Sequence, residues 1–125
     1  MTSSFTEDPH TGEFLLSEAN GNRSRESASV ASGQTLKAGQ AVMMSAGKLV
    51  AHDGTLNSDG SVTTAAAGIL LAPVDASGGE VADCAYIARD AEVNDNLVTY
   101  PAESSAGGEK AAVVASLADL GIIVR

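Results

Sequence analysis

The sequence has almost no aromatic side chains and only one cysteine. Aromatic residues make up 3% of the 125 residues and tryptophan is missing, although hydrophobic residues reach 44%. Much of that apolar fraction is alanine, which buries little surface, so the core of this single domain is small and oligomerisation would help to stabilise it. A lone cysteine excludes an intrachain disulfide and a cysteine-based metal site. We expect Cys84 to be a small buried thiol.

Basic residues are also scarce. The chain has sixteen acidic and seven basic residues, which gives a formal charge of -9. Phosphate binding requires clustered Lys and Arg, and only Arg23 and Arg25 lie close together. An acidic surface is repelled by anionic membranes, no apolar run approaches the length of a membrane span, and the polar N-terminus is unlike a signal peptide. We therefore expect no nucleic-acid partner and no membrane partner, and synthesis in the cytoplasm.

The motifs of common catalytic and metal sites are missing from the sequence. His10 and His52 lie far apart, and a lone histidine at a strand end usually serves packing or hydrogen bonding. The loop from Asp53 to Gly60 resembles a calcium loop superficially, but its best alignment leaves the last ligand position without an acid. Asp90 and Glu92 could act as an acid–base pair, but a solvated strand face explains them better. We expect no catalytic residue, no metal ligand and no cofactor.

Short apolar segments separated by Gly-rich turns fill the chain from residue 27 onwards. Residues 41–44 are typical of a strand, and so are residues 48–51 and 68–71, which flank a long polar loop. Because this loop is longer than a hairpin turn, it does not imply that its two flanking strands pair directly. Residues 83–89 predict a further strand. The pattern indicates a small domain of short, irregular strands.

The C-terminal part predicts the only helix. Apolar residues recur at helical spacing from Val113 to Leu120, and Glu109 is well placed at the start of this helix. Gly121 is suited to the C-terminal cap. The apolar run 122–124 then predicts a final buried strand. The fold class is therefore mainly β with little α (α+β), with one C-terminal helix followed by a strand.

Residues 1–26 differ from the rest of the chain. They are rich in Ser, Thr, Glu, Asn and Gly, and contain one short apolar burst, residues 14–16. Such a segment buries too little surface to order itself, so it predicts either a disordered tail or a flexible arm that orders on a partner. Large apolar side chains in a solvated segment favour the arm. The candidate partner-binding residues are Phe5, Phe14, Leu15, Leu16, Ser17 and Glu18.

Several weak motifs follow one another in an order found in a known family. They are Val30–Gly39 (VASGQTLKAG), Lys48–Thr55 (KLVAHDGT), Gly68–Leu70 after an Ala-rich run, and the ending Leu120–Arg125 (LGIIVR). From about Ser17 to the C-terminus, the sequence resembles the head decoration proteins of tailed bacteriophages, the lambda-type D family.

The resemblance implies a β-clip-like decoration domain at residues 27–125 and a capsid-binding arm at residues 1–26. It implies a viral structural protein, made in the host, that assembles as a homotrimer on the outer surface of the expanded head. There it would occupy three-fold and quasi-three-fold positions and cement the major capsid protein lattice against DNA packaging pressure. The arm would add a strand to an exposed sheet edge of the capsid protein, with residues 14–18 as the candidate strand.

Two other classes of protein stay open at this point. One is a carrier domain of the biotinyl or lipoyl kind, for which Lys48 is the only nearby candidate for modification, although it leads straight into a strand. The other is a generic β module that binds a protein or a sugar, and the scarcity of aromatic residues argues against the sugar.

Overall fold

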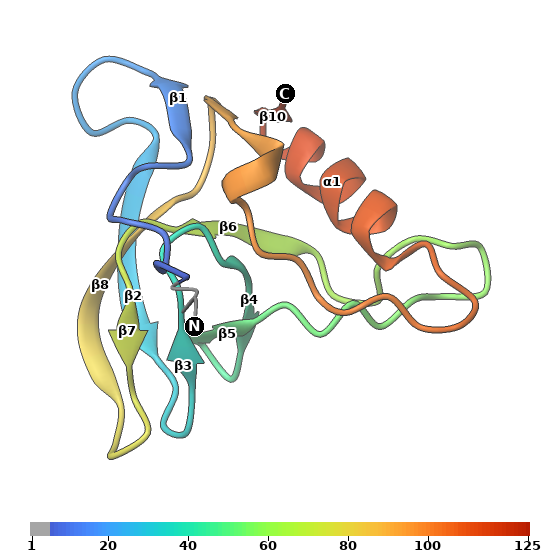
Figure 1. Ribbon diagram of the computed structural model, residues 1–125, viewed down its shortest axis with the longest axis horizontal. Helices are drawn as coiled ribbons and strands as arrows, with labels where there is room; N and C mark the ends of the chain where they lie inside the picture. Colours follow the sequence, from blue (N-terminus) through green and yellow to red (C-terminus); the bar gives the residue numbers. More distant parts are fainter. Residues whose placement is uncertain (1–5) are drawn as a thin grey trace, which may run out of the picture.

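The structure, a computed structural model, describes residues 6–125 and contains ten short strands, one α-helix and one 3-10 helix in this range. The strands form three sheets, and the helix covers one side of the molecule (Figure 1). None of the helices in residues 6–125 has the length and apolar character needed to cross a membrane. The expected fold class, mainly β with a single C-terminal helix and a final strand, is confirmed.

The largest sheet is a closed five-stranded barrel. Its strands, in spatial order, are β2 (Arg25–Val30), β5 (Lys48–Ala51), β4 (Ala41–Ser45), β6 (Ala66–Leu70) and β8 (Val81–Ile87). The strands that flank the long loop, β5 and β6, both pair with β4 and are not neighbours. The barrel is filled by a cluster of buried residues that includes Leu49, Leu70 and Cys84. The prediction of a buried thiol at Cys84 is confirmed.

A second sheet has the order β1-β9-β10, formed by β1 (Leu15–Glu18), β9 (Ala91–Val93) and β10 (Ile122–Val124). Strand β1 runs antiparallel to β9, whereas β10 runs parallel to it. Helix α1 (Glu109–Asp119) follows the 3-10 helix η1 (Asp95–Leu97) along the chain and leads into β10. A second core, with Phe14, Ile69, Val93, Leu117 and Ile122 among its members, lies between this sheet, α1 and β6.

The start and end of the helix agree with the sequence pattern. Helix α1 begins at Glu109 and ends one residue before Leu120. Gly121 has a φ of 80°, in the left-handed region that favours glycine, and its N–H donates to the carbonyl of Ala118. A third, two-stranded sheet pairs β3 (Thr35–Leu36) with β7 (Val74–Asp75).

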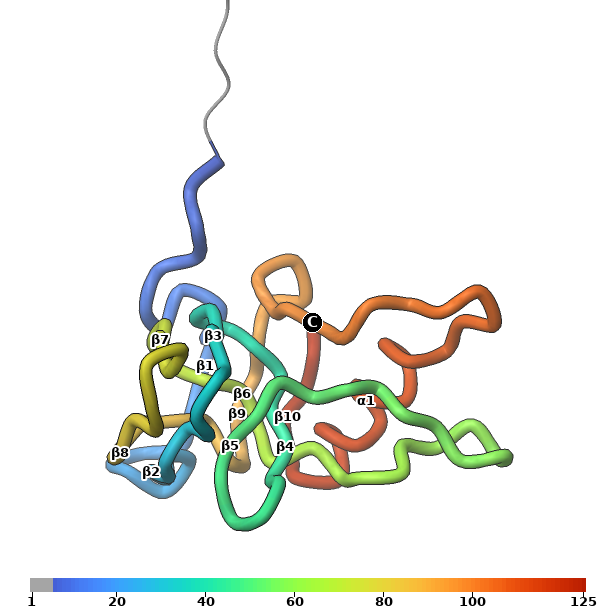
Figure 2. Tube along the Cα trace, turned by 90° about the horizontal axis from the view of Figure 1, so that it is seen from below, coloured from blue at the N-terminus to red at the C-terminus, as the bar shows by residue number. Residues whose placement is uncertain are grey.

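The sequence pattern placed residues up to 26 in an arm, but part of this segment lies in the folded body. Strand β1 pairs with β9, and Phe14 is 1% exposed. Among the described residues, the first backbone hydrogen bond from this segment to the body is donated by the N–H of Gly12 to the carbonyl of Leu71. Residues 6–11 project from the body (Figure 2). The difference arises because β1 pairs with a strand more than seventy residues away, and a sequence pattern carries no signal for such a pair.

Two long loops form the end of the molecule farthest from β8. They are residues 53–65 and 101–108, and both extend away from β8 (Figures 1 and 2). Gly54 lies where the loops touch, since a Cβ there would come within 2.9 Å of Pro101 and 3.2 Å of the Glu109 Cβ. We call residues 53–65 and 101–109 the paired-loop end.

Candidate partner-binding surface

The candidate binding residues do not act as one exposed strand. Phe14 is buried in the core, and its carbonyl accepts a hydrogen bond from the N–H of Asn94. Leu15 is half-buried opposite Val93. Leu16 is 52% exposed and lies at a bulge in β1. Phe5 lies outside the described residues. The structure therefore divides the apolar burst into a core anchor and one exposed leucine.

Strand β1 keeps one open edge. It is the outermost strand of its sheet and pairs only with β9 among the described strands. An open strand edge presents unpaired N–H and C=O groups, to which another chain can add a strand. At the opposite edge of the same sheet, Ile123 in β10 is 46% exposed. Ser17, Glu92 and Ile123 line one shallow pocket of about 290 Å³ across the sheet.

The turn between β1 and β2 is held in place by polar contacts. Glu18 accepts two hydrogen bonds from the Arg25 guanidinium, at 2.8 and 2.9 Å, and this contact lowers the pKa of Glu18. Ser24 is fully buried, and its hydroxyl accepts from the Ala19 N–H and donates to the Asp90 carbonyl. Glu18 is therefore engaged within the chain, whereas Leu16 and Ser17 face solvent.

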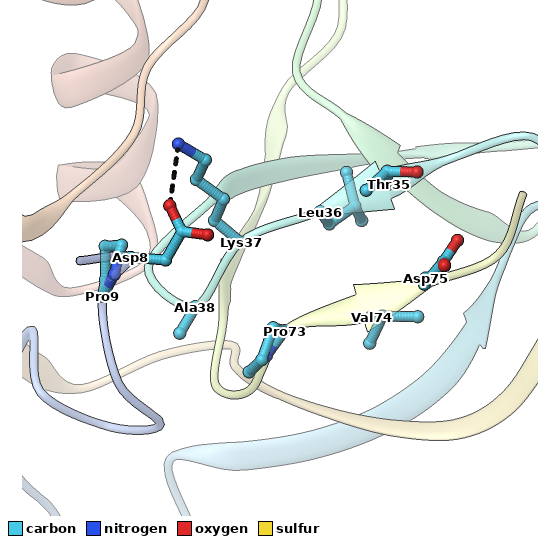
Figure 3. Close-up of a pocket in the computed structure, with 9 residues that line it drawn as sticks. All are labelled: Asp8, Pro9, Thr35, Leu36, Lys37, Ala38, Pro73, Val74 and Asp75. Carbon is cyan, nitrogen blue, oxygen red and sulfur yellow. Dashed lines mark ion pairs between the residues drawn. The ribbon is translucent and has the colours of Figure 1, made fainter. Parts of the chain in front are cut away.

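A surface groove of about 380 Å³ lies where the N-terminal segment passes the small sheet β3–β7 (Figure 3). Pro9, Leu36, Pro73 and Val74 supply much of its apolar lining. Lys37 reaches Asp8 across its mouth, with the Nζ and Oδ1 atoms 3.5 Å apart. Both side chains are exposed, so this ion pair contributes little to stability. It orients residues 6–11 relative to the body.

The two histidines have separate roles. The His10 Nε2 atom lies 2.7 Å from Glu7, whose carboxylate raises the pKa of His10 above its ordinary value of 6.5. His52 is 2% exposed, and its two ring nitrogens contact the Gly54 N–H and the Thr64 carbonyl. The Nδ1 atom accepts from the N–H, so Nε2 carries the proton and donates to the carbonyl. His52 thus fastens both ends of the 53–65 loop, as expected for a hydrogen-bonding histidine at a strand end.

The acidic residues of the 53–65 loop stabilise turns. Asp53 accepts from the Thr55 N–H, and Asp59 accepts from the N–H and hydroxyl of Ser61. These bonds lower the pKa of both carboxyl groups, because they stabilise the ionised form. No group of three or more His, Cys, Asp or Glu side chains in residues 6–125 is arranged to hold a metal ion.

Lys48, the candidate for a carrier domain, begins β5 and pairs with Ser45 in the β4–β5 hairpin. Its amine is in an ion pair with Glu80. A carrier lysine has to stand free at a hairpin tip, which here is formed by Ala46 and Gly47. The geometry gives the carrier interpretation no support.

Glu103 has a structural role that the sequence pattern did not predict. Its carboxylate accepts from the N–H groups of Glu109 and Lys110 and so caps α1 from a loop. The cap residue itself, Gly108, has no side chain to do so. A cap that comes from five positions upstream has no local sequence signature, whereas the usual cap precedes the helix directly.

These features provide edges, grooves and exposed apolar side chains, which are means of contact with another macromolecule. Comparison with known families agrees with this interpretation: the family model of the bacteriophage lambda head decoration protein D matches residues 4–122. The chain belongs to this family. The match extends over nearly the whole sequence, including strand β1. No curated protein matches the chain.

Membership in the head decoration family makes the chain a structural protein of the phage capsid. The resemblance inferred from the sequence motifs is confirmed, and the match also includes residues 4–16, which those motifs did not reach. The family is defined by decoration of the head and is not a class of enzymes.

Proposed function

We propose that the protein binds as a homotrimer to the outer surface of the expanded phage head and cements the major capsid protein lattice against DNA packaging pressure. The observation that carries this proposal is the family match over residues 4–122. The charge of -9 supports an outer position, because an acidic surface is repelled by packaged DNA. The small, Ala-rich core is suited to stabilisation by association.

In this proposal the capsid protein is contacted by residues 1–11 and by the open edge of β1, with Leu16 as the exposed apolar anchor. The projection of residues 6–11 from the body supports this role, because it leaves the segment accessible to a neighbouring surface (Figure 2). Any further ordering of this segment on the capsid costs conformational entropy, which lowers the affinity of each single arm. Three arms in one trimer compensate through avidity.

The test mixes purified protein with empty expanded heads and images the particles. We expect density at the three-fold and quasi-three-fold positions; bare heads would contradict the proposal. The mass of the free protein by analytical ultracentrifugation tests the trimer in the same preparation.

A truncation separates the arm from the folded body. Removal of residues 1–11 keeps every residue from Gly12 onwards, so we expect a folded protein with the oligomeric state of the intact chain and much weaker head binding. Removal of residues 1–22 also takes away Phe14 and β1 and should destabilise the fold itself. If the protein lacking residues 1–11 decorates heads as tightly as the intact chain, the contribution of this segment is refuted.

A further inference from the structure

The negative charge of the molecule is concentrated at one end. All Lys, Arg, Asp and Glu residues lie within residues 6–125, and each of the seven Lys and Arg side chains is within 4 Å of a different carboxylate. Sixteen acids less seven leaves nine carboxylates without a Lys or Arg partner, which equals the formal charge of -9. Five of these nine carboxylates line two pockets beside the 53–65 loop: Asp53, Asp59, Glu103, Glu109 and Asp119. No Lys, Arg or His lines either pocket.

One of these pockets is lined by a glutamate that has a buried carboxylate oxygen without a partner. The pocket has a volume of about 510 Å³ and lies within the paired-loop end, between Asp53 and Gly54 on one loop and Glu103 and Ser104 on the other. Glu109 lines it and is only 8% exposed, and its Oε2 atom makes no hydrogen bond in the structure. Buried polar atoms nearly always have a partner, because an unsatisfied one costs the full desolvation of the group.

The Glu109 side chain is held ionised. Hydrogen bonds from the Ser104 side chain and from the backbone N–H groups of Glu109 and Ser104 favour the charged form and lower the pKa of Glu109 to about 2. The Glu103 carboxylate is already used to cap the helix, so it cannot satisfy the Oε2 atom as well. At neutral pH, a ligand of this pocket therefore has to donate a hydrogen bond to the carboxylate. A positively charged donor forms the strongest such bond.

A metal ion fits this pocket poorly. No group of three or more acidic, His or Cys side chains in residues 6–125 is arranged for metal binding. A guanidinium or ammonium group on a flexible stem suits it better, since it can enter the pocket from outside and lie against the Asp53 and Glu109 side chains that line it. Because the seven basic side chains of this chain are already paired, the group is best supplied by a different protein.

We propose that the pocket of the paired-loop end receives an arginine or lysine side chain of the capsid protein, with Glu109 Oε2 as the main acceptor and Asp53 as a second one. This inference rests on the proposed function, because it takes the capsid as the partner. It adds a polar contact at the end of the molecule formed by the two long loops, separate from the open edge of β1.

The main test uses neutral variants of nearly identical shape. Glu109→Gln should weaken binding to expanded heads roughly tenfold or more, the usual loss for a hydrogen bond to a charged group. Asp53→Asn should weaken it less, since Asn keeps the bond to the Thr55 N–H. The matched control is Asp83→Asn, which removes one exposed charge far from the pocket at a position with φ of 57° that Asn tolerates. Equal binding by Glu109→Gln and the control would overturn the proposal.

A second measurement tests the pocket without capsids. N-acetyl-arginine amide is titrated into the intact protein and backbone amide shifts are followed by NMR. We expect shifts at Gly54, Gly107 and Glu109 that are lost in Glu109→Gln, whereas no shift at these residues would overturn the proposal. If the intact protein fails to bind heads but shows these shifts, the proposed function fails and the cation site stands.

Two further outcomes would also overturn the proposal. Shifts of the same amides by submillimolar Mg²⁺ or Ca²⁺ would make the pocket a metal site. A change of oligomeric state in Glu109→Gln, measured by analytical ultracentrifugation at unchanged thermal stability, would place the pocket between copies of this chain.

Discussion

Gly68 occupies a position in β6 that other residues cannot fill without moving β8. Its φ of 151° lies in a region that L side chains rarely adopt, and a Cβ would overlap the carbonyl oxygen of Ile87. The overlap involves backbone, which cannot turn aside as a flexible side chain can. A close approach of two barrel strands therefore depends on the absence of one side chain.

Gly68→Ala should lower the free energy of unfolding by about 3 kcal/mol or more, because it adds strain in φ to a backbone clash. Gly78→Ala is the matched control, since Gly78 has no heavy atom near its Cβ position and no positive φ. Urea unfolding followed by circular dichroism measures both. Equal midpoints for the two variants would show that β6 and β8 can separate without cost.

The pKa of His10 reports on the N-terminal segment. Glu7 raises it above 6.5, so the protonated form is favoured below that raised value and the stabilisation of this local contact is lost as the pH rises through it. Glu7→Gln should return the pKa towards 6.5, as measured by NMR titration, with Glu92→Gln as a distant control. Because the pair is fully exposed, the stability of the whole fold should not change. An unchanged pKa in Glu7→Gln would mean that Glu7 and His10 are not in contact in solution.

Strand β1 and the residue before it bring a buried and an exposed apolar side chain close together. Phe14, directly before the strand, is buried, whereas Leu16, at the bulge in the strand, is 52% exposed. The Ser24 hydroxyl and the Glu18–Arg25 pair hold the following turn against the body. The element is thus fixed on one edge and open on the other.

Two alanine variants test this division. Phe14→Ala should lower the free energy of unfolding by about 3–5 kcal/mol, as usual for a large buried aromatic residue. Leu16→Ala should change it by less than about 0.5 kcal/mol and should weaken binding to expanded heads instead. Thermal unfolding and head pelleting measure the two effects. If Leu16→Ala binds heads normally, the exposed side chain is not a capsid contact.

At the scale of the whole molecule, unpaired carboxylates and exposed apolar side chains lie on different parts of the surface. The two most exposed large apolar residues of the described part, Leu16 and Ile123, lie on the β1-β9-β10 sheet, while five carboxylates without basic partners line pockets beside the 53–65 loop. Long-range attraction to a basic surface speeds encounter, whereas apolar contacts slow dissociation.

Head binding should therefore depend on ionic strength mainly through the association rate. Raising the salt concentration from about 50 to 500 mM shortens the Debye length several-fold, so the association rate constant should fall while the dissociation rate changes less. Surface plasmon resonance on immobilised heads measures both. An association rate that is independent of salt would contradict the role of the acidic end.

Much of the fold could be predicted from local patterns. The helix start at Glu109, the cap at Gly121, the final strand and the buried Cys84 all follow from spacing, turn chemistry or side-chain character, which act over a few residues. The family was also recognisable, because it rests on the order of short motifs.

The extent of the N-terminal arm and the cap of α1 could not be predicted, because they depend on contacts between distant segments. The arm was predicted to extend to residue 26 because its polar composition indicates disorder, and only pairing with β9 reveals that β1 belongs to the body. The cap of α1 by Glu103 likewise depends on how a loop returns to the helix. Composition predicts whether a segment can order itself, but it cannot predict an edge supplied by another part of the chain.

The sequence by itself determined the acidic balance, the mainly β fold class and the family, because these depend on composition and on short-range patterns. The tertiary structure alone decided that Phe14 is a core residue, that Leu16 is exposed at an open edge, and that Glu109 keeps an unpaired oxygen in a pocket of carboxylates. The physical reason is that burial and electrostatic pairing are properties of neighbours in space, and the chain brings those neighbours together only when it folds.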